Sequence, residues 1–457
     1  MSFEVVGSVK PPRPVTARPA VAGALPGAVP LEAPVPERVG VAVTVLAIVA
    51  FLLYSRIVEL IPIRGLFLFL SATLLLYAAI THRLRYLRNT PSALFLFMTV
   101  WMVAAGLLGM YPGGSAERLT EVWARSLLAY VVVVCMATHL GAVRRLMAAI
   151  AWCLPAFSVL SVWLPGYVDG RLMILVSTLA NPNDFALFLV VALPFGVWYV
   201  AESRHWTVLR LIVAASVFHA VIMLVQTGSR GGMMSAIAVL ITGMVLCGRN
   251  MRMVLGVSAL AAALIGLAVV PQSLQQRYVT IVYDDVPETE GSSASFAVGS
   301  KYARLELFLT SLRATAEHPL FGVGPGMFPD YIGMKLREQG RQGPWQQTHN
   351  AYTQMSAEAG IPAALAFLGV VLFCWRHANR VRKAALTPAL RQHAGMSVCL
   401  LAALTGYAFC ALFSSIALLP VLPLITGVTV GLEESFRKAT WVPEPAAATA
   451  AAGTGSR

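Results

Sequence analysis

Long apolar runs dominate this chain, and they restrict its fold more than any other feature of the sequence. A helix needs about 20 apolar residues to cross a bilayer, whose interior supplies no water to satisfy backbone hydrogen bonds. Runs of this kind occur at residues 39–57, 63–80, 92–110, 123–140, 146–165, 184–201, 207–226, 232–248, 253–271, 351–374, 394–414 and 416–433. We therefore predict an all-α fold, a polytopic membrane bundle of about twelve transmembrane helices.

The composition agrees with a membrane bundle. Of the 457 residues, 58% are hydrophobic and 12% are charged, whereas a soluble domain is about 25% charged. The six cysteines lie inside the apolar runs, which is typical of packing residues rather than of disulfides or metal ligands with paired spacings. They are Cys135, Cys153, Cys247, Cys374, Cys399 and Cys410. We predict neither a cofactor nor a metal site.

Polar and low-complexity stretches divide the chain into five segments. We predict a disordered N-terminal segment at 1–38 and a disordered tail at 434–457, since both ends are largely low-complexity. Between them we predict a bundle of about nine helices at 39–271 and a bundle of about three helices at 351–433. The polar stretch 272–350 separates the two bundles and is predicted to be a loop domain with short helices.

Basic residues favour one set of alternating loops, which the positive-inside rule assigns to the cytoplasm. That set contains Arg83, Arg85, Arg88, Arg144, Arg145, Arg204, Arg210, Arg249, Arg252, Arg376, Arg380, Arg382, Lys383, Arg391, Arg437 and Lys438. The opposite short loops hold only Arg56, Arg64, Arg118, Arg125, Arg171 and Arg230. Both termini are thus predicted to be cytoplasmic and the 272–350 loop external. The net charge of +13 follows from the cytoplasmic loops and does not indicate a nucleic-acid partner.

A glycine-flanked arginine lies in a tight turn between two of the spans, in the sequence Gly228-Ser229-Arg230-Gly231-Gly232. The next helix starts here, and helix N-termini carry unpaired N–H groups and partial positive charge that suit phosphate. Arg230 adds a guanidinium fork that can bind two phosphate oxygens. The alternative is an arginine that only reaches the interface, but the flanking glycines, which clear space around it, favour an anion site.

Two other spans start from the predicted external side with capping residues. Asn181-Pro182-Asn183-Asp184 opens one of them, ten residues after Arg171, and Thr348-His349-Asn350 opens the other. Asn and Thr side chains are natural N-caps, so capping alone is one interpretation of both motifs. The ordinary pKa of histidine is close to neutral, which makes His349 a candidate general base.

The external loop contains three further patterns. From Lys301 onwards, apolar residues follow helical spacing at Leu305, Phe308, Leu309 and Leu312. This spacing predicts an amphipathic helix whose apolar face packs on the bundle or lies at the membrane interface. Arg304 and Ser311 fall on another face of that helix. The segment 319–326 is dense in glycine, which permits close backbone approach; no Gly-Lys-Ser/Thr follows, so it is not a P-loop. Adjacent Asp284 and Asp285 are not assigned a metal, because nucleotide sugars are cytoplasmic and this loop is predicted to be external.

These motifs, in this order, resemble those of the O-antigen ligase / O-antigen polymerase superfamily of bacterial polysaccharide enzymes. The resemblance rests on Thr227 to Gly232, Arg304, His318 to Gly326, and His349-Asn350-Ala351-Tyr352, within about residues 170–375. It implies a metal-independent glycosyltransferase in the bacterial inner membrane. Such enzymes take a glycan from undecaprenyl diphosphate on the outer face and pass it to lipid A core or to a growing repeat-unit chain.

The resemblance and the residue chemistry together suggest roles. Arg230 and Arg304 are predicted to bind the diphosphate leaving group, with Arg171 as a third cation, and His349 to deprotonate or orient the acceptor hydroxyl. Attack opposite the leaving group inverts the anomeric centre. Further substrate-binding candidates beside Arg171 are Ser229, Gly231, Asn183 and Asn350.

Two other classes of function remain open at the level of sequence. A polytopic transporter or flippase for polysaccharide or lipid carrier has a similar number of helices, but such proteins often carry two repeated halves, and no repeat is found here. A non-catalytic scaffold or polysaccharide receptor could use the same arginines and His349 to bind glycan without turnover. Consumption of a lipid-diphosphate glycan distinguishes both from an enzyme.

Overall fold

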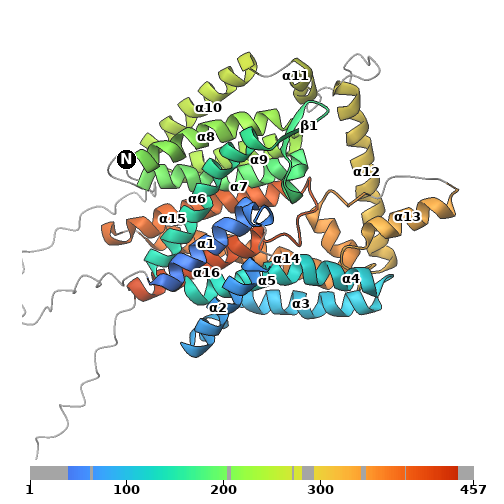
Figure 1. Ribbon diagram of the computed structural model, residues 1–457, viewed down its shortest axis with the longest axis horizontal. Coiled ribbons are helices and arrows are strands. Elements are labelled where there is room, and N and C mark those ends of the chain that lie inside the picture. Colours follow the sequence, from blue (N-terminus) through green and yellow to red (C-terminus); the bar gives the residue numbers. More distant parts are fainter. Residues whose placement is uncertain are drawn as a thin grey trace, which may run out of the picture.

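The computed structural model describes residues 40–61, 65–202, 207–269, 272–279, 293–340, 346–385 and 387–440. Within these ranges the chain is almost entirely helical (Figure 1). The predicted disordered segment 1–38, the end of the predicted tail at 441–457, and the Asp284–Asp285 pair lie outside them.

The helices follow in chain order. They are α1 (Val41–Ser55), α2 (Leu66–Ile80), α3 (Thr90–Leu108), α4 (Pro112–Arg118), α5 (Ala124–Met136), α6 (Leu140–Trp163), α7 (Pro182–Glu202), α8 (Val208–Gln226), α9 (Arg230–Leu246), α10 (Arg249–Val269), α11 (Gln272–Val279), α12 (Ser293–Glu317), α13 (Phe328–Glu338), α14 (Ala351–Ala384), α15 (Arg391–Cys410) and α16 (Val421–Thr440). A π-helix, η3 (Leu119–Trp123), joins α4 to α5. Short 3₁₀ segments are η1 (Ile57–Glu59), η2 (Arg83–Leu87), η4 (Ser177–Ala180) and η5 (Pro388–Leu390).

A helix occupies each predicted apolar run, but not every one meets the requirements for a span. Among the described residues, seven helices are long and apolar enough to cross a membrane: Thr90–Leu108, Pro112–Met136, Leu140–Trp163, Pro182–Glu202, Val208–Gln226, Ala351–Ala384 and Pro388–Cys410. Helices α1, α2 and α9 are apolar but have 15 to 17 residues, which at 1.5 Å per residue fall short of a core about 30 Å thick. The structure therefore supports a polytopic all-α bundle without establishing twelve spans.

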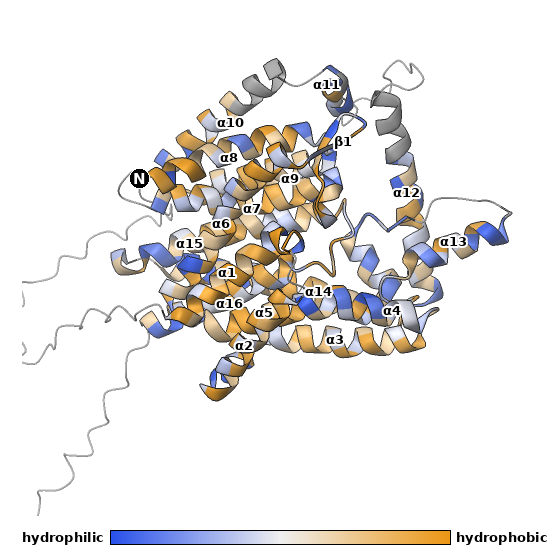
Figure 2. Ribbon diagram, in the orientation of Figure 1, coloured by the Kyte–Doolittle hydropathy of each residue, from blue (hydrophilic) through white to orange (hydrophobic). Residues whose placement is uncertain are grey.

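The bundle is built around α7 and α15, which pack against each other. In the α15 span 83% of the residues are buried, against 33% in the α3 and α8 spans. Helices α3 and α8 therefore lie on the outside of the bundle. Hydrophobic residues cover the bundle helices, while polar residues gather at their ends and on α13 (Figure 2). The six cysteines are buried and unbridged, as predicted for packing residues.

A β-hairpin interrupts the helical pattern and was not part of the all-α prediction. Strands β1 (Pro165–Val168) and β2 (Arg171–Ile174) pair antiparallel. Asp169 and Gly170 form the turn, both with positive φ, and an Asp-Gly pair is a preferred two-residue hairpin turn. The hairpin matters because β2 begins with Arg171.

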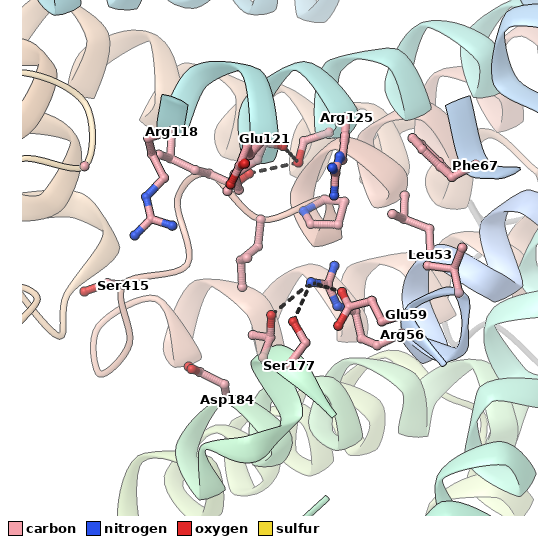
Figure 3. A pocket seen from close by; sticks show the side chains of 18 of the residues that line it. Leu53, Arg56, Glu59, Phe67, Arg118, Glu121, Arg125, Ser177, Asp184 and Ser415 are labelled. Carbon is pink, nitrogen blue, oxygen red and sulfur yellow. Dashed lines mark hydrogen bonds and ion pairs between the residues drawn. The ribbon is translucent and has the colours of Figure 1, made fainter. Parts of the chain in front are cut away.

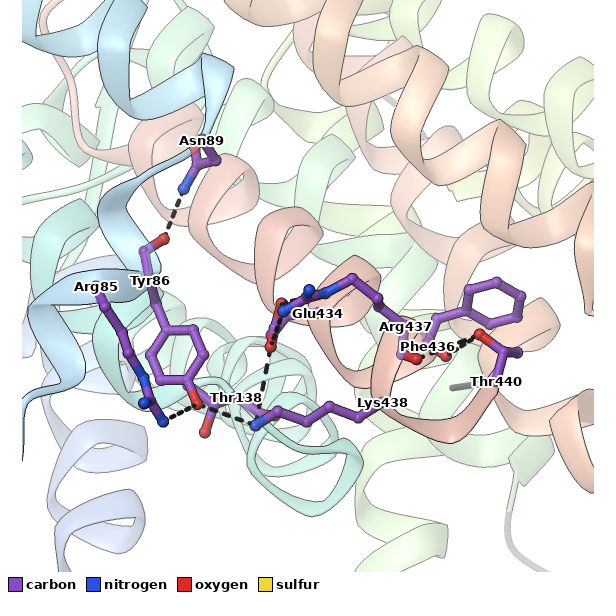
Figure 4. A network of polar contacts seen from close by, with 9 residues as sticks. All are labelled: Arg85, Tyr86, Asn89, Thr138, Glu434, Phe436, Arg437, Lys438 and Thr440. Atoms are coloured by element: carbon purple, nitrogen blue, oxygen red, sulfur yellow. Dashed lines mark hydrogen bonds and ion pairs between the residues drawn. The ribbon is translucent and has the colours of Figure 1, made fainter. Parts of the chain in front are cut away.

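The two predicted sets of basic loops lie at opposite ends of the bundle. At one end Lys438 donates to the Thr138 carbonyl (2.9 Å) and to the Tyr86 hydroxyl (3.2 Å), which joins α16 to two loops predicted to be cytoplasmic (Figure 4). At the other end Arg56 donates to Thr178 (3.1 Å), and α11, α12 and α13 gather on that side (Figure 1). The separation of the two sets agrees with the predicted alternation, while cytoplasmic and external stay predicted assignments.

Helix α16 continues seven residues past the predicted end of its run at 433. Its last turns carry Glu434, which pairs with Arg437 (2.8 Å) and lies 3.9 Å from Lys438. Pairs spaced i,i+3 and i,i+4 stabilise a helix, so charged residues that end an apolar run need not end its helix.

The described part of the loop domain contains the helices α11, α12 and α13, and α12, with 25 residues, is not short. It starts at Ser293, earlier than the Lys301 predicted. Of the two predicted positions for its leucine face, packing on the bundle is wrong, and the membrane interface stays a prediction. Leu305, Leu309 and Leu312 are 43 to 53% exposed, whereas Leu307, Ser311 and Ala314 are buried. Small side chains allow close approach to α14, where Thr315 and Ser356 share a 2.8 Å hydrogen bond.

Candidate functional site

The glycine-flanked turn has the predicted form. Gly228 adopts positive φ (57°), which glycine tolerates without strain, and Ser229 is the N-cap of α9. The Gly232 N–H donates to Ser229 Oγ (3.2 Å), and Arg230 is the first residue of the helix. First-turn amides have no intrahelical acceptor, so Arg230 lies where the helix favours an anion.

Arg171 holds this turn in place from the hairpin. Its Nε donates to the Thr227 carbonyl (2.8 Å), and its Nη2 donates to Oδ1 of Asn183 (2.8 Å). The same Asn183 oxygen accepts from Ser229 Oγ (3.1 Å). Three predicted substrate-binding residues are thus bonded to one another and to the backbone of the turn, an arrangement that positions Arg230.

Helix α11 covers the same turn from the loop domain. Arg277 donates from Nε to the Gly228 carbonyl (3.0 Å), and the Tyr278 hydroxyl donates to the Val225 carbonyl (2.7 Å). Arg277 is buried and was missed in the sequence. Its spacing gave no indication, because α11 lies outside the resembling motifs and its contacts are with residues about fifty positions earlier.

Arg304 lies on the inward face of α12, on the same side as Leu307 and Ser311. The helix therefore turns this half-buried arginine towards the bundle. Burial, followed by the Arg230 and Arg277 cations, lowers the pKa of Arg304 to about 10, and the Asp184 carboxylate opposes that shift. Arg304 remains charged at neutral pH.

His349 lies in the segment that leads into α14. Asn350 is the N-cap of α14, with Oδ1 accepting from the N–H groups of Tyr352 (3.0 Å) and Thr353 (3.1 Å). His349 adopts positive φ (52°), and its backbone N–H donates to Ser415 Oγ (2.8 Å). A non-glycine residue with positive φ is uncommon, and here the bonds on both sides hold it.

The pKa of His349 differs from the near-neutral value expected from its residue type. Burial and then the Arg304 cation lower the pKa of His349 to about 4. The imidazole is therefore neutral at pH 7 and can accept a proton, but it is a weaker base than the sequence suggested.

A pocket of about 300 Å³ brings the three principal predictions together. Its lining comes from α9, α12, the segment before α14 and the segment after α15. The residues are Arg230, Gly231, Met234, Lys301, Arg304, Leu305, Phe308, Thr348, His349, Asn350, Leu412 and Phe413. Arg230, Arg304 and His349 therefore face one space, although 119 residues separate the first from the last in the sequence. Arg171, Asn183 and Ser229 lie outside its lining.

Cations outnumber carboxylates around this pocket. Arg230, Arg304 and Lys301 line it, and Arg171 and Arg277 lie close enough to influence the others. Burial, then Arg277 and Arg304, lower the pKa of Arg171 to about 9. Like charges held together disfavour one another, so this part of the fold is prepared for an anion with more than one negative charge.

The glycine-rich segment after α12 has a structural task. Helix α14 breaks at Gly360 (φ 81°), and the segment packs into the break. Val323 N–H donates to the Ala357 carbonyl (2.8 Å) and Gly324 N–H to the Glu358 carbonyl (2.9 Å). A Cβ on Gly360 would collide with the Leu320 carbonyl. The predicted close backbone approach is present, and it anchors α12 to α14.

The family described as O-antigen ligase matches residues 215–368 of the chain. This confirms the predicted resemblance to the O-antigen ligase / O-antigen polymerase superfamily, and the matched range contains Arg230, Arg304 and His349. A search of curated proteins finds no match.

Proposed function

Because residues 215–368 carry the O-antigen ligase domain, we propose that this protein is a membrane glycosyltransferase that uses a lipid-diphosphate donor. It transfers a glycan from undecaprenyl diphosphate to a saccharide hydroxyl on the outer face of the bacterial inner membrane. The acceptor is lipid A core or a growing repeat-unit chain. The observation that carries the proposal is the pocket in which Arg230, Arg304 and His349 meet.

The diphosphate binds at the cationic side of the pocket. Arg230 and Arg304 each offer a planar fork for phosphate oxygens, and Lys301 adds a third charge. The N-terminus of α9 contributes partial positive charge to the same place. These groups stabilise the diphosphate most strongly as it departs, because its negative charge increases when the glycosyl bond breaks.

The carrier's isoprenoid chain follows the apolar side of the pocket. Leu305, Met234 and Leu412 line it and are 53, 39 and 44% exposed. Towards the C-terminal end of α9, the exposed face continues from Met234 with Ile237 and Ile241, which are 50 and 56% exposed. A lipid tail can lie along this stripe while its headgroup reaches the arginines.

His349 acts on the acceptor. The acceptor oxygen attacks the anomeric carbon, its proton passes to the neutral imidazole, and the bond to the diphosphate breaks with the electron pair leaving on phosphate oxygen. A bound diphosphate offsets the Arg304 charge, so the pKa of His349 rises above its free value. Base assistance of this kind contributes about 10²–10⁴-fold. The reaction needs no metal and inverts the anomeric centre.

The remaining predicted residues position these groups. Arg171, Asn183 and Ser229 hold the turn that presents Arg230. Asn350 caps α14 and so fixes the backbone next to His349. Gly231 lies against Phe413, with room for no more than a hydrogen, which keeps the pocket open beside Arg230.

The test is glycan transfer in proteoliposomes that contain the protein, lipid-linked donor glycan purified from the host, and lipid A core or lipid-linked repeat units as acceptor. We expect donor consumption and a longer or newly attached glycan, with both at least about 100-fold slower in His349→Ala and Arg230→Ala. Full transfer by both variants contradicts the assignment. Movement of glycan across the membrane without consumption supports a transporter, and binding without either supports a receptor.

A further inference from the structure

A second and larger cavity lies beside the pocket that contains Arg230. It has a volume of about 810 Å³ and shares no lining residue with that pocket. Figure 3 shows charged side chains that enter it from two sides, with Arg118, Glu121 and Arg125 on one helix and Arg56 and Glu59 opposite.

One thin partition separates the two spaces. Gln347 and Ser415 line the cavity, while His349 lines the pocket. The backbone N–H of His349 donates to Ser415 Oγ, 2.8 Å away. Asp184 also lines the cavity, and it lies close enough to Arg304, which lines the pocket, to oppose the lowering of the pKa of that arginine. A molecule in the cavity therefore lies next to the proposed reaction centre.

One wall of the cavity is formed by charged side chains on an otherwise apolar helix. Arg118, Glu121 and Arg125 belong to the continuous helix Pro112–Met136, which is apolar enough to span the membrane. Ionisable residues in a span are costly and usually face a water-filled cavity or a substrate path. The π-helix η3 contains Glu121, and such insertions in α-helices are frequent at functional sites.

The opposite wall is polar and held in place. Arg56 pairs with Glu59 (2.6 Å) and donates to Thr178 (3.1 Å) and Ser177 (3.4 Å). Deeper in the cavity, the Glu358 carboxylate accepts from the Gly326 N–H (2.9 Å). Rigid walls of this kind favour recognition of one ligand rather than general solvation.

The mixture of charges indicates the class of ligand. Glu121, Asp184 and Glu358 line the cavity together with its arginines, in contrast to the cationic pocket next to it. Carboxylates accept hydrogen bonds from hydroxyls and guanidinium groups donate to them, whereas the carboxylates disfavour a diphosphate. Leu418, Leu419 and other apolar residues add a surface for C–H groups.

We propose that this cavity binds the acceptor saccharide, with Glu121 and Arg125 as its hydroxyl-binding residues. The inference rests on the proposed transferase function, and it assigns donor and acceptor to two spaces on either side of the segment 347–349. An acceptor hydroxyl enters from the cavity side of the partition, opposite the diphosphate, which is the approach that inversion requires.

The test compares Glu121→Gln and Arg125→Ala with wild type in the proteoliposome transfer assay, titrating host lipid A core and lipid-linked repeat units separately. We expect the KM for the productive acceptor to rise at least tenfold, with the KM for donor within twofold. Arg249→Ala, which removes an exposed charge at the other end of the bundle, serves as the control and should change neither value.

A third variant, Ala180→Trp, narrows the cavity from η4 without removing charge. It should raise the acceptor KM in the same way, and an unchanged donor KM shows that the protein is folded. An unchanged acceptor KM in all three variants, or an equal loss for donor and acceptor, overturns the acceptor assignment. If wild type consumes no donor with either acceptor, the proposed transferase function itself fails.

Discussion

Replacement of Arg230 is the sharpest test of the anion site. This residue starts α9, lines the pocket, and is the cation that lowers the pKa of Arg304 most. Arg230→Ala removes a fork whose charge-assisted hydrogen bonds contribute about 1.5–3 kcal/mol each. Loss of one preorganised donor to a developing anion costs about 10²–10³-fold in rate, and we expect a fall of that size in kcat/KM.

Two companion variants separate charge from geometry. Arg230→Lys keeps the charge but loses the fork, so about one charge-assisted bond disappears and kcat/KM should fall about 10- to 100-fold. Arg249→Ala removes one exposed cation from the opposite end of the bundle and should leave kcat/KM within twofold.

The folded state should lose far less than the activity. Arg230 lies at a helix N-terminus and beside Arg304, where its positive charge is unfavourable in the unliganded protein. The loss of activity in Arg230→Ala should therefore be much larger than its loss of folded protein at the assay temperature. The measurements are donor consumption in proteoliposomes and thermal unfolding in detergent. Activity within twofold of wild type, or a loss that only parallels unfolding, refutes the reasoning.

Three further outcomes follow from the same geometry. Arg171→Ala should lower activity and unfolding temperature together, because the Thr227 carbonyl and the Asn183 side-chain oxygen lose their charged donor, at a cost of about 1–3 kcal/mol each. A loss of activity with an unchanged unfolding temperature would instead indicate that Arg171 contacts the substrate directly. His349 must be neutral to accept a proton, so activity should fall as the pH drops through its pKa. The acid limb of kcat/KM should lie near pH 4 in the free enzyme, and the acid limb of kcat should lie at higher pH, because the bound diphosphate raises the pKa of His349. The residual activity of His349→Ala should show neither limb. Gly231→Ala places a Cβ 2.7 Å from Phe413 and should cost about 1–3 kcal/mol of stability and much of the donor affinity. Gly256→Ala, inside α10 and with open space around its Cβ, should instead raise stability by about 0.5–1 kcal/mol and leave donor affinity unchanged.

Several structural features could be predicted from local sequence because their causes are local. Apolar runs predicted the positions of the bundle helices, since backbone groups in lipid must pair within their own segment. Ser229 and Asn350 are caps because their side chains reach amides two or three residues away. The Asp169-Gly170 turn was equally local, and the hairpin could have been predicted from it.

Other features depend on which surfaces meet. The inward face of α12 includes Ala314, which packs in one cluster with Ala357 of α14, while the more apolar face at Leu305 stays exposed. Arg277 reaches the Gly228 carbonyl only because α11 folds back over the turn. Neither arrangement has a period or a motif that a sequence reveals.

By itself, then, the sequence determined the helical class of the fold and predicted the alternation of the loops and the residue types of the proposed anion site, because bilayer hydrophobicity and helix capping act over short stretches of chain. Tertiary structure decided that Arg230, Arg304 and His349 line one pocket, that Arg171 is hydrogen-bonded to the turn before α9, and that the pKa of His349 lies near 4. Burial and the distance between charges set these properties, and both arise only when distant segments pack together.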